Sequence, residues 1–408
     1  MEILILRSSF QTNDFVRSEY AELIQRLQTE CAAKIQIVGD GENVAGTFHE
    51  TSLPDAVMIA TGGTENLFKT MVASFHDTSL REKRFVLVAD GRNNSLAAAL
   101  EILTYLENNG MEGRIVHGTN DDIINDIVVT QGLASLQGTR VGLFGHPSDW
   151  LIASNVDSSY LSEHLGVETV NIDLRRVMEG IRQVSQKEAV KVAQDIVRRS
   201  NEVKEPSCAD MVEAAKAYLA IKRICHEERL DAMTIRCFDI VKTCGTTSCL
   251  ALALLNDEGI VAGCEGDMQT LMSMLLAKRL CGTEAFMANP STLTNNTTML
   301  AHCTIPLKMC DNIKARSHFE SGIGVAIQGM LPLTDYTIFK WGGERLDRYF
   351  VAEAQALEAP YSDHFCRTQL TLNINMKPYL LEHPIGNHHV IIRGRHKKLI
   401  DNALHQLT

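Results

Sequence analysis

The sequence predicts an α/β protein with two parallel-sheet domains followed by a domain of short antiparallel strands. Three features lead to this prediction. The first part of the chain alternates continuous apolar runs with helical patterns, a second stretch repeats this texture, and the residues after about 304 change to short strands with polar turns. Continuous apolar strands separated by helices are typical of a parallel sheet covered on both faces. Short strands at close spacing favour an antiparallel barrel or sandwich.

The first predicted domain spans residues 1–138 and reads as a flavodoxin-like unit, that is, a doubly wound parallel sheet. Helices are expected between its strands, for example at 15–31 and 95–109. The expected strands are 3–6, 34–38, 56–60, 85–89 and 114–117.

The second predicted domain spans residues 139–303 and is expected to be of the same flavodoxin-like kind. It begins at Arg140, after a turn that contains Gly138. Its expected strands are 141–144, 167–172, 232–237, 259–264 and 285–288, and long helices are expected at 186–203 and 208–228. The third domain, 304–408, carries the expected short strands 324–328, 336–341, 348–353, 369–374 and 387–392.

Composition excludes several classes of protein. The chain has 408 residues, 45% of them hydrophobic, which is enough for two or three packed cores. A formal charge of −11 argues against nucleic acid and anionic lipid as partners. No apolar run approaches the ~20 residues of a membrane span, and Ile3–Leu6 is too short for a signal-peptide core. We therefore expect a cytoplasmic protein without a membrane partner.

The cysteines and the glycine-rich turn give weaker signals. Eleven cysteines without any CxxC pair fit neither a disulfide framework nor a zinc ribbon. Thr61-Gly62-Gly63-Thr64-Glu65 follows an expected strand but lacks the lysine of a P-loop and the spacing of a dinucleotide turn. It reads either as a tight strand-to-helix connection or as backbone N–H groups that hold a ligand oxygen.

The densest signal for chemistry lies where two expected strands end. Glu265 follows the buried strand 259–264, and Asn289 follows 285–288. Open parallel sheets bind ligands at the carboxyl ends of their strands, so both side chains are expected to project into one crevice. Asp267 looks like the N-cap of the next helix.

Histidines could complete such a site. His302 lies in Ala301-His302-Cys303-Thr304, and His388 and His389 are neighbours near the carboxyl terminus. Adjacent residues of a strand face opposite sides, so at most one of His388 and His389 can serve any one site. A single histidine is more often a surface residue or a hydrogen-bonded core residue, and the spacing does not decide between these readings.

Together with these residues, an ordered set of short motifs resembles the L-fucose isomerase and L-arabinose isomerase superfamily, in particular its short fucose-isomerase-like bacterial members. The set covers roughly residues 234–392. The motifs are Arg236-Cys237-Phe238, Cys249-Leu250-Ala251-Leu252, Leu255-Asn256-Asp257-Glu258-Gly259-Ile260, Cys264-Glu265-Gly266-Asp267, Phe286-Met287-Ala288-Asn289-Pro290, His302-Cys303-Thr304, Glu320-Ser321-Gly322-Ile323-Gly324, Cys366-Arg367-Thr368-Gln369 and Gly386-Asn387-His388-His389-Val390.

This resemblance implies two flavodoxin-like domains, a C-terminal antiparallel β-barrel and a homo-oligomer, a trimer or hexamer. It also implies an aldose–ketose isomerase that uses Mn²⁺ or another divalent metal, held by two carboxylates and a histidine. Glu265 matches the first carboxylate, His389 most nearly matches the histidine, and His302 matches a further metal-site histidine of the arabinose branch.

The position of the second carboxylate is Asn289 in this chain. An amide still offers one oxygen as a metal ligand, but it brings no charge and cannot accept a proton as a carboxylate does. Asp267 and Glu320 are the candidates to compensate for it.

The leading hypothesis is an intramolecular oxidoreduction of a monosaccharide, in which a proton moves between C1 and C2 through an enediol with the help of the metal. Glu265 is the expected metal ligand and a candidate base, with Asp267 and Asn289 as further catalytic candidates. Residues expected to contact the sugar or an anionic substituent are Asn296, Glu320, Arg367, His388 and His302.

Two alternatives stay open. The same site could act on a modified sugar or catalyse another enediol reaction, such as epimerisation or dehydration, which product identity would reveal. Alternatively, the chain could be a sugar-binding or regulatory protein that has lost catalysis. Asn289 favours this second alternative, whereas Glu265, His302 and His389 argue against it.

Overall fold

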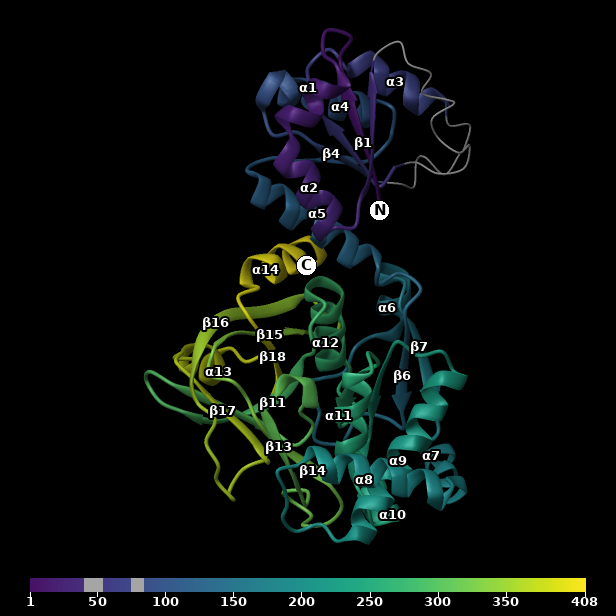
Figure 1. Cartoon of the computed structure of the whole chain (residues 1–408), viewed down its shortest axis with the longest axis vertical. Coiled ribbons are helices and arrows are strands. Elements are labelled where there is room, and N and C mark those ends of the chain that lie inside the picture. The colour runs from purple at the N-terminus through teal and green to yellow at the C-terminus, as the bar shows by residue number, and fades with distance from the viewer. Residues whose placement is uncertain (40–53, 75–83) are drawn as a thin grey trace. The chain divides into compact units, whose positions relative to one another are not determined.

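The computed structural model describes residues 1–39, 54–74 and 84–408 (Figure 1). The chain divides into two compact units, Met1–Gln131 and Gly132–Thr408. No helix in the described ranges is long and apolar enough to cross a membrane.

The first unit is built on a five-stranded parallel sheet in the order β2-β1-β3-β4-β5. Its strands are β1 (Glu2–Arg7), β2 (Lys34–Gly39), β3 (Ala56–Ile59), β4 (Phe85–Val88) and β5 (Gly113–Val116). Its helices are α1 (Asn13–Glu19), α2 (Ala21–Glu30), α3 (Glu65–Ser74), the short η2 (Arg92–Asn94), α4 (Ser95–Asn108) and α5 (Asn120–Ala134).

Both faces of this sheet are buried, which explains why its strands are continuous apolar runs. Ile3 and Ile5 of β1 belong to the core formed with α1, α2 and α5. Leu4 and Leu6 point to the opposite face, into the core formed with α3 and α4. Successive strand residues face opposite sides, so a sheet covered twice needs apolar residues at every position.

The second unit contains a four-stranded parallel sheet in the order β10-β9-β6-β7. Its strands are β6 (Arg140–Phe144), β7 (Glu168–Ile172), β9 (Ala232–Ile235) and β10 (Val261–Cys264). The helices are α6 (Ser158–Leu165), α7 (Leu174–Gln183), α8 (Gln186–Arg199), α9 (Cys208–Glu227), α10 (Cys237–Cys244), α11 (Cys249–Asp257) and α12 (Met268–Cys281).

Six later strands form a closed antiparallel barrel in the order β11-β12-β17-β16-β15-β18. Its strands are β11 (Phe286–Leu293), β12 (Thr298–His302), β15 (Asp335–Gly342), β16 (Arg348–Glu358), β17 (Thr368–Leu372) and β18 (His389–Arg393). Two helices, α13 (Lys377–Glu382) and α14 (Lys397–Leu407), and the short η3 (Leu307–Met309) accompany it.

One expected strand belongs to a different sheet from the one that the sequence suggested. The segment 285–288 was expected to be a strand of the parallel sheet, but β11 pairs antiparallel with β12 and β18 in the barrel. A short apolar run has the same pattern in either kind of sheet, so the sequence could not distinguish them. The barrel therefore takes in residues that precede the predicted boundary at 304.

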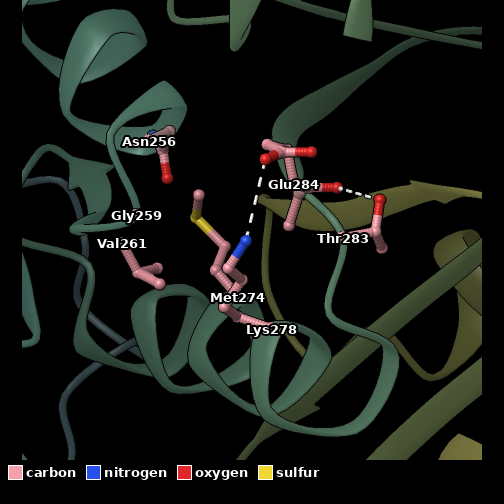
Figure 2. A pocket seen from close by; sticks show the side chains of 8 residues that line it. Asn256, Gly259, Val261, Met274, Lys278, Thr283 and Glu284 are labelled. Atoms are coloured by element: carbon pink, nitrogen blue, oxygen red, sulfur yellow. Dashed lines mark hydrogen bonds and ion pairs between the residues drawn. The ribbon is translucent and has the colours of Figure 1, made fainter. Parts of the chain in front are cut away.

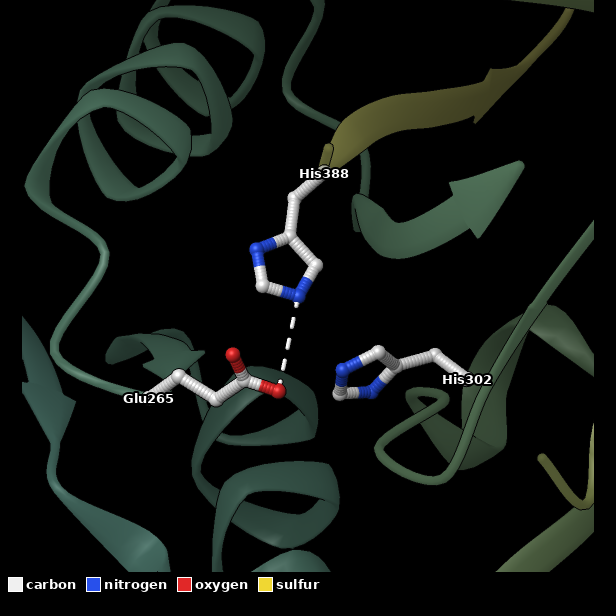
Figure 3. A group of neighbouring side chains, drawn as sticks. All are labelled: Glu265, His302 and His388. Atoms are coloured by element: carbon white, nitrogen blue, oxygen red, sulfur yellow. Dashed lines mark ion pairs between the residues drawn. The ribbon is translucent and has the colours of Figure 1, made fainter. Parts of the chain in front are cut away.

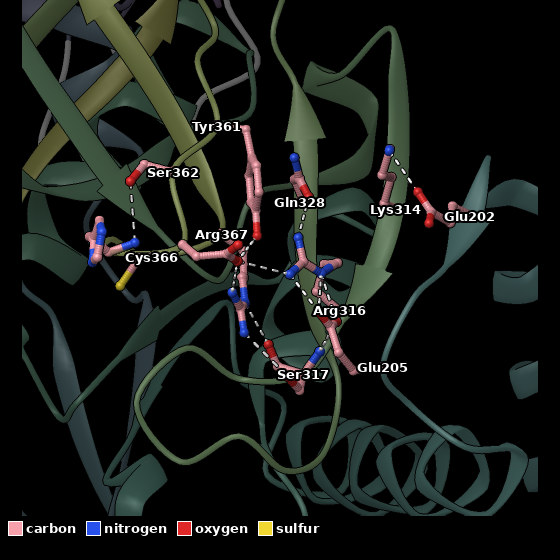
Figure 4. Close-up of polar contacts among 12 residues, drawn as sticks. Glu202, Glu205, Lys314, Arg316, Ser317, Gln328, Tyr361, Ser362, Cys366 and Arg367 are labelled. Carbon is pink, nitrogen blue, oxygen red and sulfur yellow. Dashed lines mark hydrogen bonds and ion pairs between the residues drawn. The ribbon is translucent and has the colours of Figure 1, made fainter.

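A small third sheet, in the order β14-β13-β8, lies in the same unit. Its strands are β8 (Glu202–Val203), β13 (Asn312–Arg316) and β14 (Ala326–Met330). Figure 4 shows Arg316 of β13 between Glu205 and Gln328. The Arg316 side chain is only 2% exposed, so it depends on these acceptors.

The predicted fold class, two flavodoxin-like parallel sheets followed by an antiparallel β-barrel, is confirmed. The finer division at residues 138 and 303 stays a prediction.

Replacing Glu205 by Gln should lower the free energy of unfolding by about 1–3 kcal/mol at pH 7, because the buried Arg316 loses its closest carboxylate and keeps only Asp363, at 3.3 Å, as a charged partner. Burial raises the pKa of Glu205, but the hydrogen bonds from Arg316 outweigh it and leave the pKa below its usual value. The difference in the free energy of unfolding between wild type and variant should therefore be largest above the unfolded pKa of about 4.3. It should disappear as the pH falls through the pKa of Glu205 in the folded protein.

Urea unfolding monitored at several pH values would measure this difference. Glu202→Gln is the matched control, since Glu202 pairs with Lys314 at the exposed surface and its loss should leave stability unchanged. Equal effects of the two substitutions would contradict the prediction.

Candidate metal centre

Glu265 is held at the carboxyl end of β10 by an unusual backbone. It adopts φ +63°, and Gly266 follows at +74°. A Cβ at residue 266 would lie 2.8 Å from the Cα of Pro147, so only glycine fits there. The N–H of Ser148 donates to the carbonyl oxygen of Glu265 at 2.8 Å. A left-handed glutamate costs about 1–2 kcal/mol, and strain of this kind is typical of functional sites.

Two histidines of the barrel meet this carboxylate. His302 ends β12, and His388 immediately precedes β18. Glu265, His302 and His388 each offer one ligand atom, and these atoms all lie within 4.8 Å of one another (Figure 3). The Nε2 atom of His388 lies 3.7 Å from Oε1 of Glu265. Residues of the parallel sheet and of the barrel thus converge on one point.

Hydrogen bonds behind the cluster fix both imidazoles. Nδ1 of His388 donates to Oδ2 of Asp267 at 2.9 Å, and Nδ1 of His302 lies 2.9 Å from the hydroxyl of Thr304. In each ring Nε2 is therefore left for another partner. Nε2 of His388 is buried and makes no hydrogen bond. A buried nitrogen that makes no hydrogen bond, with a carboxylate oxygen only at 3.7 Å, is costly, and a metal ion would satisfy it.

Asp267 lies behind His388. It is fully buried at the N-cap of α12, where it accepts from the backbone and the hydroxyl of Thr270. Nζ of the fully buried Lys340 is 3.7 Å away. The N-cap prediction is thus confirmed. With its oxygens engaged on these partners, Asp267 is placed to orient His388, and a direct catalytic role for it finds no support in this geometry.

The charges of the cluster are strongly coupled. Burial raises the pKa of Glu265, but His388 and the other nearby groups outweigh this effect and bring it down to about 2. Burial lowers the pKa of His388, yet Asp267 and Glu265 raise it to about 9. Burial and the charge of His388 lower the pKa of His302 to about 3. At pH 7 the carboxylate is therefore ionised and His302 is neutral, as metal ligands must be, whereas His388 is protonated and would release a proton on binding a metal ion.

These residues fit a divalent ion. Two imidazoles and one carboxylate suit first-row divalent metals, and the second layer provided by Asp267 and Thr304 is the usual support for metal-bound histidines. Asn289 lies on β11, where it pairs with Ala301, the neighbour of His302. A role for its amide oxygen as a further ligand stays a prediction.

His389, the histidine expected to bind the metal, makes its hydrogen bonds away from the cluster. Its Nδ1 donates to the carbonyl oxygen of Asn387 at 3.0 Å, and its Nε2 accepts from the hydroxyl of Tyr379 at 2.9 Å. Both ring nitrogens are therefore occupied away from Glu265. Adjacent residues of a strand point in opposite directions, so His388 faces Glu265 where His389 does not. His388 was expected to contact the substrate, and it lies instead within the cluster itself.

Three other residues were expected to contact the sugar, namely Asn296, Arg367 and Glu320. Asn296 is exposed in the hairpin before Thr298. His302 lies at the other end of β12, which is about 13 Å long. Arg367 is buried and donates to the carbonyl oxygen of Ser317 at 2.8 Å (Figure 4). Glu320 is exposed in the turn that follows β13.

Trp150 was missed by the sequence analysis. Its indole N–H donates to Oε2 of Glu265 at 2.6 Å, and its ring meets Phe238 edge-on at 5.0 Å. A contact between residues 115 positions apart leaves no local pattern. The only available signal was a rare tryptophan six residues after the end of the predicted strand 141–144.

Two hollows in the described residues lie elsewhere. One of about 10 Å³, room for about one water, lies beside Val261 at the amino end of β10, opposite to Glu265 (Figure 2). The other, of about 530 Å³, is in the first unit and is lined in part by Gly62 and Gly63 of the glycine-rich turn. The two readings of that turn thus stay open.

The comparisons with known proteins point to sugar isomerases. The chain is 24% identical over 314 residues to the sulfoquinovose isomerases of Priestia aryabhattai and Priestia megaterium, a match that covers 72% of this chain and 69% of theirs. It is also 24% identical over 250 residues to the sulfoquinovose isomerase of a Clostridium species, covering 58% and 55%. No protein-family model matches the chain. The similarity agrees with the predicted enzyme class, whereas the narrower assignment to the L-fucose and L-arabinose isomerases stays a prediction.

Replacing His388 by Gln should weaken Mn²⁺ binding by at least about 100-fold, because loss of even a supporting residue costs about 10- to 100-fold. His389→Gln is the matched control and should leave the affinity nearly unchanged. Isothermal titration calorimetry with MnCl₂ measures both values. A larger loss in the His389 variant would restore the original assignment of the metal histidine.

Proposed function

We propose that the protein is a divalent-metal-dependent aldose–ketose isomerase, an intramolecular oxidoreductase of carbohydrate metabolism. The observation that carries the proposal is the buried cluster of Glu265, His302 and His388, with its unpartnered nitrogen. The similarity to sulfoquinovose isomerases supports a sugar as the substrate and makes the sulfonated sugar sulfoquinovose the first one to test. The expected homo-oligomer and cytoplasmic location remain predictions.

In this proposal Glu265, His302 and His388 hold the metal, with Mn²⁺ as the expected ion. A bound divalent ion would polarise the sugar carbonyl and make the neighbouring C–H group more acidic. Asp267 keeps Nδ1 of His388 protonated, so Nε2 is the nitrogen that would lose its proton and bind the metal. The hydrogen bond from Trp150 occupies one oxygen of Glu265 and leaves the other toward the histidines.

Proton transfer between C1 and C2 needs a base outside the metal-binding set, since Glu265 cannot easily serve as ligand and base at once. Asp267 is enclosed, so we assign this role to Glu320. A series of ring contacts connects its neighbourhood to the cluster. Glu320 lies two residues after His318, the His318 ring contacts Phe238 at 5.5 Å, and Phe238 contacts Trp150, which donates to Glu265. Burial and the charge of Glu265 raise the pKa of Glu320, which makes it the stronger proton acceptor of the two.

Ketose formation from a panel of sugars tests the activity. The panel contains sulfoquinovose, pentoses, hexoses and 6-deoxy sugars, each with Mn²⁺ and with a chelator. We expect metal-dependent turnover of one sugar or a small group, and loss of turnover in His388→Gln. Products other than the ketose would favour a different enediol reaction. Sugar binding without any product would favour the sugar-binding alternative that Asn289 suggests.

Replacing Glu320 by Gln should lower kcat by about 100- to 10,000-fold while Mn²⁺ affinity stays within about twofold, because Glu320 moves a proton and does not bind the metal. Steady-state kinetics and calorimetry separate the two effects. Glu163→Gln, an exposed glutamate on α6, is the control. Full activity in the Glu320 variant would move the base elsewhere, and a large loss of metal affinity would make Glu320 a ligand.

A further inference from the structure

The loop between β6 and α6 is fixed over the candidate metal centre by contacts along its length. Ser148 donates to the Glu265 backbone, and Arg236 donates to the carbonyl oxygen of Pro147 at 2.8 Å and to Asp149 at 2.7 Å. Further along the loop, the buried side chain of Gln269 donates to the carbonyl oxygens of Ala153 and Asn155 at 3.0 and 3.1 Å. Trp150 is therefore carried by a segment whose position is set on both sides.

The indole of Trp150 is itself held on two sides. Its N–H donates to Glu265, and its ring forms a T-shaped contact with Phe238, with an angle of 86° between the ring planes. Phe238 in turn contacts His318. Nevertheless Trp150 is 49% exposed. A large apolar ring that is fixed in place, exposed and bonded to a member of the metal cluster offers a ready surface to a bound molecule.

We propose that Trp150 is a substrate-contacting residue, whose open indole face packs against the C–H groups of the sugar while its N–H fixes the Glu265 carboxylate. The inference rests on the proposed function, because it places the reacting sugar at the metal cluster. The C–H groups of a sugar carry partial positive charge and the face of an indole is negative, so the two surfaces attract each other. A sugar whose oxygens reach the cluster lies beside this ring.

Fluorescence gives a readout that does not depend on turnover. The chain has two tryptophans, and Trp341 is fully buried, with its N–H on the carbonyl oxygen of Leu346. Iodide should therefore quench Trp150 almost alone. We expect saturating sulfoquinovose with Mn²⁺ to reduce iodide quenching to the level of a Trp150→Phe protein, in which only Trp341 emits.

Two substitutions separate the ring from its N–H. Trp150→Leu removes both and should raise KM for sulfoquinovose by about tenfold. Trp150→Phe keeps an aromatic face, so KM should rise by less than about threefold, while Mn²⁺ affinity falls because Glu265 loses its donor. Ile152→Ala, on the same loop and 87% exposed, is the matched control and should change neither value. Circular dichroism and thermal unfolding confirm that each variant is folded.

The outcomes distinguish this inference from the proposed function. Turnover of sulfoquinovose by wild type with an unchanged KM in Trp150→Leu overturns the role of Trp150 and leaves the isomerase in place. Protection of Trp150 by the sugar without turnover retains the contact and overturns the isomerase. The absence of both protection and turnover overturns both.

Discussion

The hydrogen bond between Asp267 and His388 is the interaction on which the rest of the candidate site depends. It joins the first turn of α12, which follows the parallel sheet, to the start of β18 in the barrel. Asp267 is also the N-cap of α12, so the same carboxylate begins a helix and orients an imidazole. Since Lys340 lies beside it in the core, its negative charge is tolerated without solvent. A substitution of Asp267 would therefore disturb both the start of α12 and the orientation of His388.

The neighbouring residues show how backbone strain and packing work together. Glu265 occupies a left-handed conformation that a glutamate avoids on its own. Contacts of Gly266 with Pro147, and of Ser148 with the Glu265 carbonyl oxygen, make this conformation the one that fits. The loop that imposes the strain is the one that carries Trp150, so a single segment sets both the backbone and the carboxylate of Glu265.

Sequence reasoning named two residues of the candidate cluster, Glu265 and His302, but it did not single out His388 as the third. Glu265 could be found because a buried strand followed by an acid points to the carboxyl edge of a parallel sheet. Alternation along a strand limits the choice to one of His388 and His389. It does not say which of the two points toward Glu265, because that depends on how the barrel closes. The membership of β11 in the barrel, and the contact of Trp150 with Glu265, arise only from tertiary packing. Asn289 remains a departure from the resembled family that this fold does not explain.

The two halves of the cluster come from chain segments far apart, since the Asp267–His388 hydrogen bond spans 121 residues. Loop closure over such a separation is slow, so the cluster forms late in folding, after both the sheet and the barrel have assembled. A metal ion cannot then act as a nucleus for the chain, because the unfolded protein presents no matching set of ligands. An ion bound only by the folded protein would act on unfolding instead, as a reversible cross-link that extends the lifetime of the native state.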